Sequence, residues 1–247
     1  MDIWQRHEVF EIEVLDRMNS ARLLDPLVFG GGTMLRLCHE LPRYSVDLDF
    51  WLVRKITRKS FFDKALKIIE KFYEVTDAQI KHFTLLFELR TARYPKRLKI
   101  EIRREPEECE YQEKIAFSRF SSHQVILKAH TLDQTMKNKI KAFLDRQEIR
   151  DCFDIEFLLR KGVALNINDK GKILSFRKKL SHLKERDFKV KLGSILETPV
   201  RQYYVQHRFS FLEEKLSFLD IVGLGSGDGS PVARDHDAVL YPRRRSQ

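Results

Sequence analysis

A triple glycine that precedes a short helix and a strand with two aspartates constrains this chain more than any other feature. The segment covers residues 30–50 and reads GGGTMLRLCHELPRYSVDLDF. Glycines adopt backbone conformations that are closed to other residues, so this run predicts a tight turn into a helix that begins near Thr33. The amides at the start of a helix form a concave site that favours anions. The Thr33 hydroxyl would donate to a phosphate oxygen, or it would cap the helix.

Asp47 and Asp49 lie one residue apart in a strand predicted at residues 46–53. Because side chains alternate along a strand, both carboxylates project from the same face. Two carboxylates so placed can hold a hard cation such as magnesium, which completes its coordination with water and substrate phosphates. The spacing alone is a weak signal. A glycine turn and two carboxylates separated by one short helix together favour nucleotide chemistry.

A third carboxylate on a neighbouring strand would complete a site for two metal ions. The candidate is Glu101, which the alternation of side chains places on the polar face of a strand predicted at residues 97–104. The alternative is that Glu101 is an exposed strand residue that pairs with Lys99 or Arg103.

The apolar periodicity predicts a mixed α/β domain at residues 1–125 and a helical domain at residues 126–222. In the first domain we expect helices at 2–19 and 59–75, a short helix from Thr33 to before Pro42, and strands at 46–53, 80–90 and 97–104. In the second we expect helices at 131–146, 150–161, 166–184, 188–197 and 199–219. Residues 223–247 lack periodicity and are rich in Gly, Ser and Arg, which predicts a disordered tail.

The formal charge of +10 is concentrated in the C-terminal half. Residues 176–209 hold nine Lys or Arg against three acids, interleaved with the aromatic residues Phe176, Phe188, Tyr203, Tyr204 and Phe209. Such a mixture is typical of surfaces that bind a phosphate backbone and stack on unpaired bases. The alternative is an amphipathic helical region whose aromatic residues form a core.

The three cysteines are widely spaced and form no C-x-x-C pair, so we expect reduced thiols without a metal. No stretch reaches the roughly 20 apolar residues of a membrane span, and the N-terminus is too charged for a signal peptide. We therefore expect a cytoplasmic protein that does not bind membranes.

The segment GGT, the L-x-L that follows it and PRYSVDLDF resemble the AbiEii/AbiGii toxin-like nucleotidyltransferases of the DNA polymerase beta-like superfamily. The later stretch KNKIKAFLDRQEIRDCFDIEFLL is similar to a second block of that family, a lysine-bearing helix followed by an R-D-x-x-D helix. The resemblance covers residues 29–159 in segments. It implies a minimal nucleotidyltransferase domain that uses a nucleoside triphosphate with magnesium or manganese. It also implies a toxin with a cognate antitoxin and with RNA or tRNA as acceptor.

Carried over residue by residue, the resemblance implies that Gly32 and Thr33 form a phosphate-binding turn and that Asp47 and Asp49 are metal ligands. It also implies that Lys139 contacts the triphosphate, and that Asp151 and Asp154 are the acidic positions of the second helix. Lys139 and Arg146 recur on one helical stripe, which could hold a triphosphate. The alternative is that these cations pair with Asp151 or Asp154 as bridges between helices. The family's usual third carboxylate is an aspartate, so Glu101 departs from its pattern.

The sequence therefore predicts a two-domain nucleotidyltransferase whose helical domain closes over the active site. The backbone amides from Gly31 to Thr33 would hold the phosphates together with Lys139. An acceptor hydroxyl, deprotonated with help from the metal and Glu101, would attack the α-phosphate and expel pyrophosphate. Two alternatives stay open: transfer to a protein side chain, as in AMPylation, and a noncatalytic module that binds RNA or a partner protein.

Overall fold

The computed structural model describes residues 1–103, 108–167 and 169–224, with side chains as far as Phe218. The expected disordered tail at 223–247 lies outside the described residues, apart from the end of the last helix. None of the helices in the described ranges is long and apolar enough to span a membrane.

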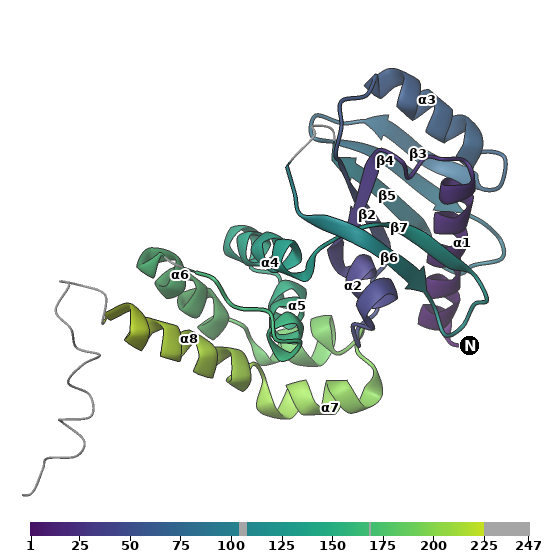
Figure 1. Ribbon diagram of the computed structural model, residues 1–247. Coiled ribbons are helices and arrows are strands. Elements are labelled where there is room, and N and C mark those ends of the chain that lie inside the picture. Colours follow the sequence, from purple (N-terminus) through teal and green to yellow (C-terminus); the bar gives the residue numbers. More distant parts are fainter. Residues whose placement is uncertain (104–107, 168, 225–247) are drawn as a thin grey trace, which may run out of the picture.

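A seven-stranded mixed sheet forms the N-terminal half, with the strand order β3-β4-β5-β2-β1-β7-β6 (Figure 1). The central strands β2 and β5 are parallel and buried on one face, while β3 and β6 form the edges. The strands are β1 Leu27–Gly30, β2 Asp47–Leu52, β3 Glu74–Ile80, β4 Thr84–Arg90, β5 Leu98–Arg103, β6 Tyr111–Phe117 and β7 Gln124–His130.

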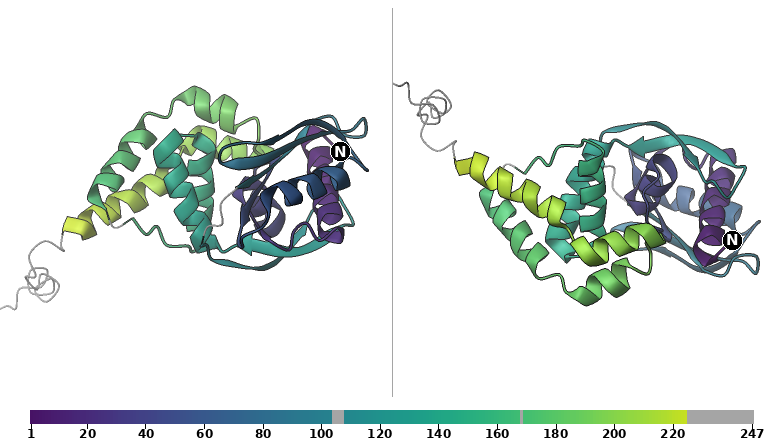
Figure 2. Two further views of the ribbon diagram at one scale, coloured as in Figure 1. Left: turned by 90° about the horizontal axis from the view of Figure 1, so that it is seen from above. Right: turned by 90° about the horizontal axis from the view of Figure 1, so that it is seen from below.

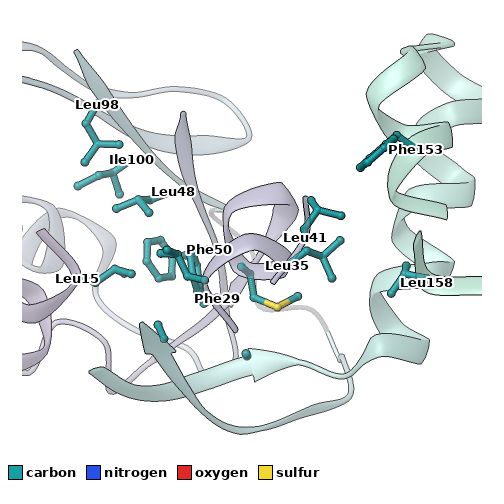
Figure 3. Packing of buried hydrophobic residues seen from close by; sticks show 14 of the residues in the cluster. Leu15, Phe29, Leu35, Leu41, Leu48, Phe50, Leu98, Ile100, Phe153 and Leu158 are labelled. Atoms are coloured by element: carbon teal, nitrogen blue, oxygen red, sulfur yellow. The ribbon is translucent and has the colours of Figure 1, made fainter. Parts of the chain in front are cut away.

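Three helices cover one face of the sheet: α1 Ile3–Ser20, α2 Gly31–His39 and α3 Arg58–Ile69. Figure 2 shows the sheet curving around them. The alternation along β2 turns Leu48 and Phe50 toward these helices, where they pack with Leu15, Phe29 and Ile100 (Figure 3). The same alternation turns Asp47 and Asp49 to the opposite face of the sheet.

The C-terminal half consists of helices that lie beside the open face and one end of the sheet (Figure 1). They are α4 Leu132–Arg146, α5 Ile149–Arg160, α6 Lys170–Ser181, a π-helical turn η1 Asp187–Leu192, α7 Thr198–His207 and α8 Ser210–Leu224. Thr131 caps α4, since its side chain accepts a hydrogen bond from the Gln134 amide. The two halves are joined by backbone contacts: the Tyr44 amide donates to the Ile195 carbonyl at 2.8 Å, and Arg43 forms an isolated β-bridge with Leu196.

The predicted mixed α/β fold followed by helices is confirmed, but several elements differ. The helix predicted at 59–75 ends at Ile69, and β3 follows where a helix end was expected. The sheet continues through β6 and β7 to His130, so the predicted domain boundary at 125 falls inside a strand. The helix predicted at 199–219 is broken at Arg208, whose φ is +50°.

The aromatic residues of the basic segment belong mainly to the core of the helical half. Four of them, Phe176, Phe188, Tyr204 and Phe209, are at most 5% exposed, whereas Tyr203 is 39% exposed. The amphipathic alternative is therefore correct for these four, and stacking on bases by them is excluded. Eight of the nine cations of the segment are exposed, and Lys179 is partly exposed; the eight are Arg177, Lys178, Lys184, Arg186, Lys189, Lys191, Arg201 and Arg208.

Candidate active site

The glycine turn lies directly against the aspartate strand. Gly31 has a φ of +74°, a conformation that strains other residues, and a Cβ on it would overlap Asp49 Oδ2. A Cβ on Gly32 would likewise overlap the Arg43 guanidinium. In the sheet, Gly30 is the antiparallel partner of Asp49. The start of α2 and the Asp49 carboxylate are therefore neighbours.

Asp47, Asp49 and Glu101 lie on the open face of adjacent parallel strands. Asp49 is in register with Glu101, and Asp47 with Lys99. Burial, followed by the negative charges of Asp47 and Glu101, raises the pKa of Asp49 to about 7. Burial is also the main cause of the raised pKa of Asp47. A divalent cation would offset the free-energy cost of burying these negative charges and the repulsion between them, so the two aspartates fit a metal.

Glu101 stays a prediction as the third metal ligand. Its Oε1 lies 3.2 Å from the Lys99 ammonium, and both side chains are more than one third exposed. In the part of the chain that the structure describes, no three His, Cys, Asp or Glu side chains form a group that could hold a metal. The contact with Lys99 and the partial exposure of the side chain agree with the alternative, in which Glu101 is a strand residue paired with Lys99.

Thr33 has a different role from the one expected. Its side chain is completely buried, and its hydroxyl donates a 2.6 Å hydrogen bond to the Asp47 carbonyl. The N-cap of α2 is Gly30, which makes no side-chain cap. The Thr33 hydroxyl therefore neither points at a phosphate nor caps the helix. It ties the start of α2 to the start of β2 and so fixes the turn beside the aspartates.

Lys139 and Arg146 on α4 lie across a cavity from Gly31 and Asp49. The Lys139 ammonium lies 2.6 Å from Asp154 Oδ2 and 3.1 Å from Asp151 Oδ1. Arg146 donates to both oxygens of Asp151 at 2.8 and 2.9 Å. The two aspartates on α5 are fully buried and do not line the cavity described below. The ion pairs between α4 and α5 that we considered as the alternative are therefore present. Contact of Asp151 and Asp154 with a nucleotide stays a prediction, although both carboxylates are buried behind these cations.

Arg43 completes this network and was missed in the sequence. Its Nε and Nη2 donate to the two oxygens of Asp154 at 2.6 and 2.7 Å, a paired geometry that suits guanidinium and carboxylate. Burial alone would raise the pKa of Asp154, but Arg43 and Lys139 hold it below its ordinary value. The signal was local, because Arg43 stands in the PRYS segment just before the aspartate strand.

One cavity of about 260 Å³ lies between the open face of the sheet and α4. It brings together five of the predicted residues: Gly31, Asp49, Glu101, Lys139 and Arg146. Its other lining includes Trp51, Arg103 and His130. Burial lowers the pKa of His130 to about 4, so its imidazole is neutral near pH 7.

A mixed sheet with paired aspartates beside a glycine turn, faced by a helix that carries a lysine, defines the class of the nucleotidyltransferases. The chain belongs to the family of the AbiEii nucleotidyl transferase toxins of type IV toxin–antitoxin systems, whose sequence pattern matches residues 13–219. The resemblance seen in the sequence is therefore confirmed. The protein is a nucleotidyltransferase of a toxin family.

Solved structures agree with this fold. A Helicobacter pylori protein to which nucleotidyltransferase activity has been attributed is 24% identical, with a TM-score of 0.54, over 85% of this chain and 96% of its own. JHP933 from Helicobacter pylori is 22% identical, with a TM-score of 0.53, over 87% of this chain and 96% of its own. A comparison with curated protein sequences gives no match.

Proposed function

We propose that this toxin transfers a nucleotide from a nucleoside triphosphate to an RNA acceptor such as tRNA, with a divalent metal and release of pyrophosphate. The observation that carries the proposal is the cavity in which the Gly31 turn and Asp49 face Lys139 and Arg146. It combines an anion site with carboxylates that suit a cation, which together match a metal-bound triphosphate.

The chain supplies phosphate contacts from two sides. The amides at the start of α2 present partial positive charge, and the Lys139 ammonium and Arg146 guanidinium face them across the cavity. The buried carboxylates of Asp151 and Asp154 hold these cations in place, so less ordering is needed when the phosphates bind.

Asp47 and Asp49 would hold the metal, for which we propose magnesium or manganese. When bound, the ion would neutralise phosphate charge and promote loss of the acceptor proton. The RNA acceptor is favoured by the exposed cations between Arg177 and Arg208, because clustered Lys and Arg bind phosphate backbones. We place the protein in the cytoplasm, where both substrates occur.

Incubation of the protein with each labelled nucleoside triphosphate, magnesium and total cellular RNA tests the proposal. We expect labelled RNA on a gel, no label with EDTA, and neither labelling nor growth inhibition by the double variant Asp47→Ala/Asp49→Ala. The matched control is Asp25→Ala/Asp63→Ala, which removes two exposed carboxylates and should keep full activity. Activity that persists without Asp47 and Asp49 would refute the proposed site. Label that follows protein would replace RNA by a protein acceptor.

A further inference from the structure

Three residues that line the cavity, Trp51, Arg103 and His130, are not used by the proposed phosphate contacts, and we call this group the second end of the cavity. Trp51 lies two residues after Asp49 on β2, so both side chains share the open face of the sheet. Arg103 ends β5 and His130 ends β7, and these strands lie on either side of β1 and β2. An aromatic and cationic group thus adjoins the phosphate end.

The Trp51 ring is held in a defined position. Its centroid lies 4.6 Å from that of His130, at an interplanar angle of 63°, and the Arg103 guanidinium carbon lies 5.1 Å above the indole. Beneath both rings lies Gly30, where a Cβ would stand only 2.5 Å from the Trp51 ring and 2.7 Å from His130 Nδ1. The first glycine of the turn is therefore needed for the rings to pack here.

His130 contributes a second, independent observation. The residue is 1% exposed, and its Nε2 has no hydrogen-bond partner within the described ranges. Its Nδ1 lies 3.5 Å from the Asn138 side-chain nitrogen. A buried polar atom without a partner is unfavourable, and His130 lines the cavity, so a polar ligand that reached Nε2 would relieve this cost.

We propose that Trp51 and Arg103 form a nucleobase subsite, in which the base stacks on the indole in the place that the Arg103 guanidinium holds here, the displaced guanidinium covers its outer face, and His130 lies at its polar edge. The inference rests on the proposed function. A nucleobase suits this end because it combines a flat aromatic face with a polar edge. The cavity of about 260 Å³ lies just below the range for small ligands, roughly 300–1,000 Å³, so it leaves room for no more than one nucleotide. The base of the donor triphosphate is the first source, and the terminal base of the acceptor is the second.

Tryptophan fluorescence tests the subsite without catalysis. Trp4→Phe leaves Trp51 as the single tryptophan of the chain. In this background we expect a nucleoside triphosphate to quench the emission and inorganic tripolyphosphate to leave it unchanged. Quenching by a short RNA but not by the free triphosphate would support the subsite with the acceptor as source. Equal quenching by tripolyphosphate, or none by nucleotide or RNA, would overturn the inference.

Kinetics separates this inference from the proposed function. Trp51→Leu and Arg103→Gln should each raise KM for the quenching substrate about tenfold, while Trp51→Phe retains most of the affinity. Arg103 is exposed, so its variant tests the subsite even if Trp51→Leu fails to fold. Nucleotide transfer with an unchanged KM in Arg103→Gln and Trp51→Leu would overturn the subsite alone. Base-dependent quenching without any transfer would overturn the proposed function alone.

Discussion

Replacement of Asp154 by alanine should destabilise the protein severely. The carboxylate is fully buried and accepts from Arg43 at 2.6 and 2.7 Å and from the Lys139 ammonium at 2.6 Å. Asp154→Ala leaves the Arg43 side chain, 3% exposed, without its carboxylate. Loss of one partner of a buried pair costs about 3–5 kcal/mol of unfolding free energy. For a chain of this length, that corresponds to a fall in Tm of roughly 6–20 °C.

Urea and thermal unfolding, followed by circular dichroism, measure this loss. The double variant Arg43→Met/Asp154→Leu removes both charges. Its loss of unfolding free energy should be well below the sum of the losses in Arg43→Met and Asp154→Leu alone. The exposed pair Lys59 and Asp63 provides the control, since Asp63→Ala should change stability by less than about 0.5 kcal/mol. A loss below about 1 kcal/mol in Asp154→Ala, or additive losses in the double variant, would refute the argument from buried charge.

Two further predictions concern the turn and the first helix. Gly31→Ala should reduce the initial rate of nucleotide transfer more than about a hundredfold, because its Cβ displaces Asp49. Gly162→Ala, at a φ of +86° with open space around it, is the control for backbone strain and should retain activity; equal rates in the two variants would contradict the steric reasoning. Burial lowers the pKa of His7 from 6.5 to about 4. Between these pH values the unfolded chain binds a proton at His7 that the folded chain does not, so the stability of the wild type falls as the pH drops from 6.5 to 4. Relative to His7→Gln, the wild type should lose about 3 kcal/mol of unfolding free energy between pH 7 and 4, measured with urea; parallel curves for the two proteins would exclude a buried neutral His7.

The elements near the glycine turn could be predicted because their signals are local. The glycines and the D-x-D alternation each lie within a few residues of the structure they specify. The edge strand β3 could not be recognised in this way, because most of its side chains are at least partly exposed and its apolar alternation is weak. The strand β6 is mainly exposed as well, which explains why the sheet extends beyond its expected end.

The site was predicted in part for the same reason. Residue types and spacing indicated which side chains could meet a triphosphate, but not which of them would be buried behind the cavity. Asp151 and Asp154 resemble binding residues in sequence, yet their oxygens are occupied by cations of the same chain. Arg43 acts on Asp154, 111 residues away, and such a contact is specified only by the packing of α5 against the loop before β2.

The backbone contacts of Arg43 and Tyr44 with Leu196 and Ile195 have a consequence for synthesis of the protein. A nascent chain completes the aspartate strand early, but the loop that carries Arg43 reaches its final pairing only after residue 196 has left the ribosome. Fragments that end earlier lack these contacts, so the loop beside the glycine turn is not fixed by them. We therefore expect the contacts that fix this loop to form only after nearly the whole described chain has been translated.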